Sequence, residues 1–503
     1  MPAKHLARVV WAIVAELDVS AAEARYSSLG RHGYAPRHLL AVWVYASMVG
    51  MHYASVLARA LKTDAALRLL AGGYEISPQT LRRFRQHSQP LFQAALEQTV
   101  RMAVTRGLLR EDELAVDSMR LRAHASRKAV RTKSRSQQRV AELRDEVVRE
   151  TTDDAKRALL EQKLAQHQQA LRDCEEQGRT SLVRTNMLAG LIKFPNGGSA
   201  PEHRLTVTGS GRQARLAIGV LVDAAPNDYG HLQPAVEQLL RILERAGVPK
   251  GRLRLMGDAG YWDGESLAYA EQQRSAIEVL IAEHPVSTKR ERAGLFQHED
   301  FKLAADGRKV HCPAGKAMHG PKAKGRGVKR WTGDGCRACS LRDRCCTPGL
   351  KYRTYTASPA FEKARSEMRA RLTTPEGRAA YGARMATIEP IFASLESDMG
   401  FRRASSRHAQ TVLAEVLLKL LAHNLGRLVA TRTHRRPFLC LAHAGGILSD
   451  PVRARPSRSR KSRTLAAARS PLTLPLPLTR TLADLRWTGG PLTHMGQPRE
   501  HGA

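Results

Sequence analysis

The chain has 503 residues, and its 81 lysines and arginines outnumber its 47 aspartates and glutamates, so its formal net charge is +34. A balance this basic favours a polyanionic partner, with nucleic acid ahead of an anionic membrane surface. The longest apolar stretch, residues 39–51, is too short to cross a bilayer, and Glu16 close behind the first apolar run argues against a signal peptide. Four of the seven cysteines fall between positions 336 and 346, which does not fit a secreted disulfide framework and favours a reducing compartment.

The first 108 residues carry helix-like apolar spacing, over residues 37–51 and again over 55–70. A further helix is predicted over residues 77–88, where a Ser cap precedes Pro at the first helical position. This helix presents Gln79, Arg82, Arg83 and Arg85. It fits a DNA groove, and the alternative is a surface helix with a solvated basic face. We expect residues 1–108 to form a helical DNA-binding domain.

ELAVDSMRLR (113–122) predicts a short strand that contains Asp117, and a run of basic residues follows it up to Arg135. Residues 137–176 are polar and helical, with a helix restart predicted at Thr152 to Asp154. We expect a helical hairpin or coiled coil at about 130–180, inserted into a domain rather than forming one.

Strand patterns resume in HRLTVT (203–208) and ARLAIGVLV (214–222), and a helix is predicted from about Tyr229 to Ala246. The run LRLMGD then predicts a strand that stops at Asp258. A helix over 263–274 and a strand over 277–283 complete the alternation. This order of elements is typical of an α/β fold.

Residues 285–355 break the pattern with Gly, Lys, Cys and Pro, so we expect a Cys-rich insertion there. Helices are predicted over 359–371, 374–397 and 409–431. Beyond residue 435 the chain is rich in Arg, Ser and Pro, and no acidic residue occurs from Pro451 to Ala483. We expect residues 433–503 to form a basic disordered tail.

Three carboxylates stand out in these elements: Asp117 in the first core strand, Asp258 at a strand end, and Glu389 in a predicted helix that also carries Arg384. Carboxylates suit Mg²⁺, and two such ions can clamp the attacking and leaving oxygens in phosphodiester cleavage. Taken singly, Asp258 is also consistent with a turn or helix cap, and Glu389 with a solvated helix residue. The three together, in this order of strands, favour a metal site that acts on a phosphate backbone.

The same blocks resemble those of the DDE transposases of bacterial insertion sequences, from about residue 25 to residue 430. AVDSMRLRAHAS is similar to the block with the first catalytic Asp, MGDAGYWDGE to the second, and YGARMATIEPIFASLE to the third. YSSLGRHGYAPRHLLAVWVYASMVGMHYASVLARAL and PQTLRRFRQ resemble the family's N-terminal helical domain, and GFRRASSRHAQ and LLAHNLGRL its closing helices. The resemblance places the catalytic and metal-binding roles on Asp117, Asp258 and Glu389.

The resemblance also implies the fold and the chemistry. It implies an α/β ribonuclease-H-like mixed-sheet core over residues 109–432, an N-terminal all-α domain, and the helical-hairpin and Cys-rich insertions. It implies cleavage of element ends with Mg²⁺ or Mn²⁺, followed by strand transfer into target DNA. The implied partner is double-stranded DNA, namely terminal inverted repeats and target, bound by a homodimer in the bacterial cytoplasm near the nucleoid. The DNA-binding residues that it implies, with those of the helix above, are Arg82, Arg83, Arg85, Arg384, Arg402 and Arg403.

The chain departs from the family at three positions. Ser118 follows Asp117 where Gly is frequent, Glu396 stands where Lys is frequent, and His408 stands where Gly is frequent. A Glu at position 396 would repel a DNA phosphate. Two alternatives therefore stay open: a catalytically silent DNA-binding protein descended from a transposase, and a zinc-stabilised nuclease without strand transfer.

The cysteines form a second group of candidate ligands. A Cys-x2-Cys pair with a third Cys six residues on and a fourth upstream suits a tetrahedral zinc site, and the alternative is a set of reduced, unliganded thiols. Cys174 and Cys440 are expected to be unrelated to this group. The candidate zinc ligands are Cys312, Cys336, Cys339 and Cys345, with Cys346 adjacent to the last.

Overall fold

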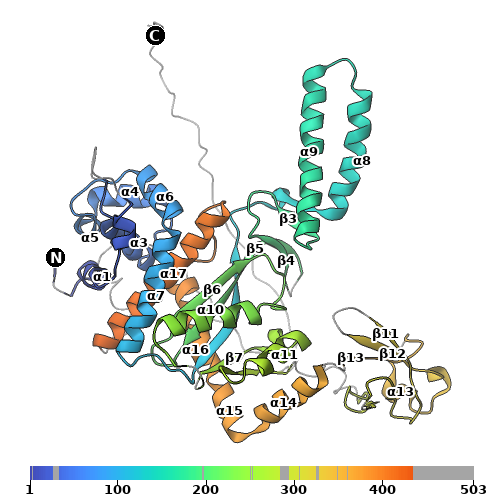
Figure 1. The fold of residues 1–503 in the computed structure, drawn as a ribbon. Coiled ribbons are helices and arrows are strands. Elements are labelled where there is room, and N and C mark those ends of the chain that lie inside the picture. The colour runs from blue at the N-terminus through green and yellow to red at the C-terminus, as the bar shows by residue number, and fades with distance from the viewer. Residues whose placement is uncertain are drawn as a thin grey trace, which may run out of the picture. The chain divides into compact units, whose positions relative to one another are not determined.

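The structure is a computed structural model, shown in Figure 1. It describes residues 1–2, 4–25, 33–194, 197–249, 251, 253–283, 294–304, 306–323, 328–347, 349–358 and 361–433. The segment expected to be a basic tail lies outside the described residues from position 434 onward, and so does Cys440.

In the described residues, seven helices precede the first strand. They are α1 (Leu6–Ala15), α2 (Ser20–Glu23), α3 (Pro36–Met48), α4 (Ala54–Thr63), α5 (Ala65–Leu70), α6 (Pro78–His87) and α7 (Gln89–Thr105). The Ser77 hydroxyl accepts a hydrogen bond from the Thr80 amide, as expected of the cap of α6. The single helix predicted over 55–70 is wrong, because the Asp64 carboxylate caps α5 by accepting from the amides of Ala66 and Leu67 and so divides the segment in two.

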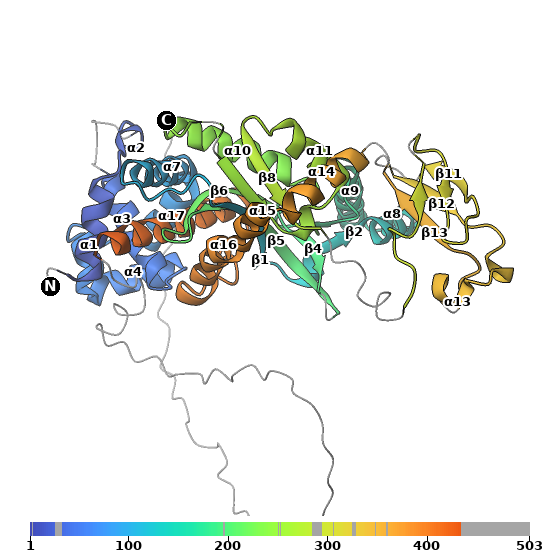
Figure 2. The same ribbon diagram turned by 90° about the horizontal axis from the view of Figure 1, so that it is seen from below.

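The last described helix, α17 (Ala409–Thr433), packs against α3 and α7 of this N-terminal group and against the central sheet. Figures 1 and 2 both show α17 running among the N-terminal helices. One buried amide joins all three parts: the Asn424 side chain donates to the Thr99 hydroxyl and the Ala217 carbonyl, and accepts from the Ala217 amide. Because a buried polar group without partners is costly, this set of bonds fixes where α17 meets the sheet.

The central sheet is mixed. Its strands are β1 (Leu114–Arg122), β4 (Gly190–Lys193), β5 (Ser199–Ser210), β6 (Leu216–Asp223), β7 (Leu253–Gly257) and β8 (Ile277–Ile281). Strand β5 pairs antiparallel with β1 on one side and with β4 and β6 on the other, whereas β1, β7 and β8 run parallel. The order β6-β5-β1-β7-β8 confirms the α/β fold with a ribonuclease-H-like mixed sheet that the sequence predicts.

Alternate residues of each strand face opposite layers of helices. Leu114 and Val116 of β1 pack with α10 (Leu232–Arg245) and α11 (Gly264–Gln272), while Ala115 and Met119 pack in the cluster that contains α16 (Arg384–Ala393) and α17. Met256 of β7 belongs to the same cluster as Ala115. Because side chains alternate, Asp117, two positions after Ala115, and Asp258, two positions after Met256, point toward the α16 layer.

Two further parts interrupt this core. Helices α8 (Lys133–Arg149) and α9 (Asp154–Glu176) lie antiparallel side by side between β2 (Val130–Thr132) and β3 (Ser181–Val183), as Figure 1 shows. The Asp153 side chain caps α9 at the predicted restart. The described residues of the Cys-rich insertion (about 285–355) carry short strands, a 3-10 turn at Cys336–Ala338 and a short helix: β9 (Lys302–Leu303), β10 (Val310–His311), β11 (His319–Ala323), β12 (Lys329–Thr332), α13 (Arg342–Cys345) and β13 (Thr354–Ala357).

The segment after the Cys-rich insertion begins with α14 (Glu362–Thr373). The single helix predicted over 374–397 is wrong. It consists of α15 (Pro375–Gly382), α16 and a π-helical turn at Ser394–Asp398. Pro390 lies inside α16 and cannot donate a backbone hydrogen bond, which helps to explain the irregular turn that follows.

Candidate active site

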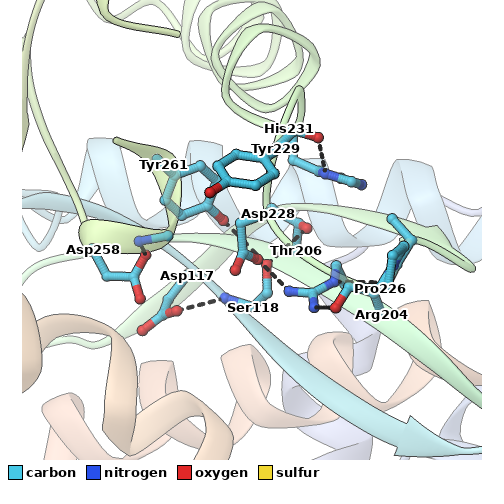
Figure 3. A network of polar contacts seen from close by, with 12 residues as sticks. Asp117, Ser118, Arg204, Thr206, Pro226, Asp228, Tyr229, His231, Asp258 and Tyr261 are labelled. Atoms are coloured by element: carbon cyan, nitrogen blue, oxygen red, sulfur yellow. Dashed lines mark hydrogen bonds and ion pairs between the residues drawn. The ribbon is translucent and has the colours of Figure 1, made fainter. Parts of the chain in front are cut away.

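Asp117 and Asp258 lie at adjacent positions on neighbouring parallel strands. Val116 of β1 pairs with Gly257 of β7; Asp117 is the next residue of β1, and Asp258 is the first residue after β7. By the alternation described above, both side chains point toward the α16 layer. Figure 3 shows the two carboxyl groups close together above that layer. Parallel strand pairing therefore brings together two acids that are far apart in the sequence.

Asp117 is held by groups on both of its oxygens. Its Oδ1 accepts from the Ser118 amide at 2.7 Å, and its Oδ2 accepts from Nη1 of Arg384 on α16 at 2.7 Å. Burial raises the pKa of Asp117 and the neighbouring Asp258 adds to that, while the hydrogen bond and charge of Arg384 oppose it. The carboxylate therefore stands in a place that favours a nearby cation.

Asp258 caps a single 3-10 turn, Ala259–Tyr261, by accepting from the Gly260 amide on Oδ1 at 2.8 Å. The alternative that Asp258 is a turn or helix cap therefore applies to one of its two carboxylate oxygens, Oδ1. Among the described residues, no hydrogen bond or ion pair is made by Oδ2. That oxygen is available to a ligand.

Glu389 lies on α16, but it does not join the two aspartates. Its side chain is exposed, and within the described part of the chain it makes no hydrogen bond or ion pair. It lies five positions after Arg384, so at about 100° per residue it points about 140° away around the helix from the side chain that contacts Asp117. Across the described ranges, the structure contains no cluster of three or more His, Cys, Asp or Glu placed to hold a metal ion.

The sequence analysis did not find a partly buried polar network behind the aspartates. The Tyr261 hydroxyl lies 3.1 Å from the Ser118 hydroxyl, which lies 3.0 Å from that of Thr206 on β5. Burial raises the pKa of Tyr261 well above its usual value, so the phenol is neutral. Figure 3 shows Asp228 beside this group, bound to the guanidinium of Arg204.

Gly260 separates Asp228 from Asp258. A Cβ at position 260 would lie 2.7 Å from Oδ2 of Asp228 and 2.9 Å from Oδ1 of Asp258, so both carboxylates border the same point. Arg204 also donates to the carbonyls of Ala225 and Pro226, which holds the loop after β6 in place. The signal that could have found Asp228 is its position: like Asp258, it follows shortly after the end of a core strand.

The residues predicted to contact DNA fall into two classes. Arg82 and Arg83 are exposed on α6, and Arg402 and Arg403 are exposed after the π-helical turn. The expectation that Arg85 contacts DNA is wrong. Only 5% of it is exposed, because it lies over the Trp43 ring, donates to the His52 carbonyl at 2.8 Å and faces Glu415 at 3.8 Å. It is a packing residue inside the helical group and is not placed to reach a DNA groove.

Five cysteines line one hollow of the Cys-rich insertion, although among the described residues no three of them are placed to hold one metal ion. Cys345 and Cys346 are buried, and burial raises the pKa of the Cys345 thiol to about 11. Neutral thiols are expected there unless a cation binds, since a metal would favour the thiolates. The residues that line the hollow include Cys312, Cys336, Cys339, Cys345 and Cys346. Cys174, expected to be unrelated, is buried on α9.

Comparison with known families gives two matches. A family described as "Transposase DDE domain" matches residues 311–429, and one described as "Transposase domain (DUF772)" matches residues 1–87. Both matches are to transposase families, and together they support a DDE transposase of insertion-sequence type. No curated protein matches the chain. Asp117 and Asp258 lie between the two matched segments, whereas Arg384 and Glu389 lie inside the DDE-domain match over residues 311–429.

The DDE domain indicates an enzyme that cleaves nucleic acid, and the family typically uses a divalent metal ion. Transposases act on DNA, so transposition of DNA is the process that this family supports. None of the helices in the described ranges is both long and apolar enough to cross a membrane.

Proposed function

We propose that this transposase cleaves the ends of its own element and joins them to target DNA, with Asp117 and Asp258 at the reacting phosphate. The observation that carries the proposal is the pairing of Val116 with Gly257, which sets the two carboxylates side by side on one face of the sheet. Both aspartates, with Arg384, belong to blocks that resemble those of the family. Mg²⁺ or Mn²⁺ is the proposed cofactor.

The residues present fit such an ion in part. Asp258 has an oxygen without a partner in the described chain, and Asp117 is a buried carboxylate next to another acid. Mg²⁺ needs only one or two carboxylates if waters and substrate phosphates supply its other ligands. When bound, the ion would supply activated water and neutralise charge on the phosphate. Glu389 is the third proposed ligand, and it requires a side-chain rotation or a shift of α16 to reach the others.

The chain's own side chains perform the positioning. Arg384 donates one N–H group to Asp117, and its other N–H groups can donate to a phosphate oxygen. In the first step, a water oxygen forms a bond to phosphorus and the bond to the 3′ oxygen breaks, which leaves a 3′-OH and a 5′-phosphate. In the second, that 3′-OH attacks a target phosphodiester and displaces the target's 3′ oxygen. Asp117 and Asp258 would lie beside the reacting phosphate in both steps.

The remaining expectations complete the proposal. The helical residues 1–108 would bind the terminal inverted repeats through Arg82 and Arg83, residues 109–432 would carry the chemistry, and a homodimer would hold the two ends. Arg402 and Arg403 would hold the DNA backbone.

The five cysteines around one hollow support a structural Zn²⁺, since thiolate sulfur is a preferred zinc ligand. Elemental analysis of purified protein would measure about one zinc per chain, and less in Cys336→Ser.

The test uses purified protein, Mg²⁺ and a labelled duplex that carries an element end beside a plasmid target. We expect nicking at the end and joined products that contain the label. Asp258→Asn should abolish both, because it removes a ligand charge, while Asp263→Asn should not, because Asn also caps α11. Nicking without joining would support a nuclease instead, and binding without nicking would support a silent DNA-binding protein.

A further inference from the structure

A hollow on the surface of the core is lined by cationic side chains from three separate segments. We call it the basic hollow. Among the described residues, no acidic side chain lines it. The side chains that give it its charge and shape are those of His124, Lys128, Arg184, Arg403 and Arg407.

Backbone hydrogen bonds fix the three segments around the basic hollow. The Arg122 amide donates to the Arg402 carbonyl at 3.2 Å, and the Ala404 amide donates to the Arg122 carbonyl at 2.9 Å. The Arg184 amide donates to the Ala129 carbonyl at 3.0 Å. These bonds hold together the end of β1, the turn after it, the segment after β3 and the segment before α17. The backbone that carries the cations is therefore fixed in position.

The charge of the basic hollow is not compensated. Within the described residues, none of Lys128, Arg184, Arg403 and Arg407 makes an ion pair. Nearby Arg131 is crowded by like charges: burial lowers its pKa, and Arg184 adds to the effect. Cations of the adjoining hairpin differ, since Arg139 pairs with Glu146 at 2.7 Å. Like charges held together cost free energy unless an anion joins them, so the hollow favours a polyanion.

The basic hollow also has a fixed distance from the candidate active site. Arg122 and Asp117 lie on the same strand, five positions apart, which spans about 17 Å at about 3.3 Å per residue. Along duplex DNA, where phosphates of one strand advance by about 3.4 Å per base pair, this distance corresponds to about five base pairs. One DNA strand can therefore reach both places.

We propose that the basic hollow binds phosphates of duplex DNA within about five base pairs of the cleaved position, without regard to base sequence. The inference rests on the proposed function, in that it takes the Asp117 and Asp258 pair as the place of cleavage. In the described residues the hollow is lined by four cations and one imidazole, which suit the phosphates that every base sequence carries. Arginine and lysine also read guanine, so the test compares two duplexes of different sequence.

The test compares full-length wild type with a triple variant, Lys128→Gln, Arg184→Gln and Arg403→Gln. The matched control removes three exposed cations of the hairpin helices, Arg144→Gln, Arg149→Gln and Arg157→Gln. Dissociation constants are measured without divalent metal over a range of salt, on an element-end duplex and on a duplex of unrelated sequence. Thermal melting of each protein verifies that it is folded.

We expect the triple variant to bind both duplexes at least tenfold more weakly than wild type, with a slope of log affinity against log salt that is smaller by about 2 to 3. The control should stay near wild type. Ethylation interference on the end duplex should lose its signal within about five base pairs of the cut. A triple variant that matches the control, or that loses affinity for only one duplex, would overturn the proposal.

Failure of the hollow and failure of the proposed function give different results. If the triple variant loses DNA affinity as expected but wild type never cleaves or joins DNA, the basic hollow stands and the transposition chemistry fails. If wild type cleaves and joins DNA while the triple variant binds as the control does, the chemistry stands and the inference about the hollow fails.

Discussion

Arg384 and Asp117, which lie 267 positions apart in the sequence, are joined by a hydrogen bond of 2.7 Å between two side chains that are each about one-seventh exposed. This contact ties α16 to β1 at the place where β1 and β7 present their acids. It therefore couples the position of Glu389, on the same helix, to the aspartate pair. Loss of this contact should affect chemistry more than folding.

Replacement of Arg384 tests that coupling. Arg384→Gln should lower the rate of end cleavage by about 10- to 100-fold, since a hydrogen bond to a charged group contributes about 1.5–3 kcal/mol. Arg384→Lys keeps the charge and should recover part of the rate. Single-turnover cleavage of an element-end duplex provides the measurement. If Gln and wild type cut equally fast, the contact has no part in the chemistry.

Gly260 should tolerate no side chain. Gly260→Ala would place a Cβ 2.7 Å from Asp228 and 2.9 Å from Asp258, so one carboxylate must move. We expect cleavage to fall at least tenfold while the melting temperature falls by only a few degrees. Gly382→Ala is the matched control, because no atom lies within 4 Å of its Cβ and it ends a helix. Normal cleavage by Gly260→Ala would contradict the close approach of the two acids.

The pair formed by Arg204 and Asp228 should contribute strongly to stability. Arg204 is 4% exposed, and its removal would leave a carboxylate of which little is exposed without its partner. Arg204→Met alone should reduce the free energy of unfolding by about 3–5 kcal/mol. The double variant Arg204→Met with Asp228→Asn should recover much of that loss, and denaturant unfolding monitors all three proteins. A double variant as unstable as the single one would show that the loop needs the arginine itself.

Lys419 predicts a dependence of stability on pH. It is 2% exposed on α17, and burial lowers its pKa to about 7, although Glu415 opposes the shift. Between pH 7 and the higher pKa of the unfolded chain, the unfolded state binds the extra proton, so this group makes the protein more stable as pH rises. Below pH 7 Lys419 is protonated in the folded state as well. Its buried charge then destabilises the fold, and the stability no longer depends on pH through this group.

Lys419→Met removes that dependence. The variant should be more stable than wild type at pH 6, and the advantage should shrink above pH 7 by up to about 1.4 kcal/mol per pH unit. Melting curves of both proteins from pH 6 to pH 9 give the difference. A constant difference across this range would mean that Lys419 does not lose its proton on folding.

Local pattern predicts much of the core. The strands that hold Asp117 and Asp258, and the capped starts of α6 and α9, follow from alternation and from Ser and Asp caps. The burial of Arg85 was also readable, since Leu81, Phe84 and Arg85 follow the i, i+3, i+4 spacing of a buried face. Its partner Glu415 was not, because nothing local links two residues so far apart.

Other features depend on tertiary contacts that no pattern in one segment records. Asp228 meets Gly260 only because the loop after β6 folds over the end of β7. The break that separates α15 from α16 sets where the helix of Glu389 begins, and so which way Glu389 points. The basic hollow requires three segments, one before the hairpin, one after it and one near residue 403, to meet at the end of β1.

The central claim is that Asp117 and Asp258 together bind the divalent ion that serves DNA cleavage. Electron paramagnetic resonance of Mn²⁺, titrated into the protein with element-end duplex present, measures that binding directly. We predict that wild type and Asp263→Asn bind Mn²⁺ with similar affinity, and that Asp117→Asn and Asp258→Asn each weaken it at least tenfold while still binding the duplex. Equal Mn²⁺ affinity in all four proteins would contradict the assignment of the ion to these two aspartates.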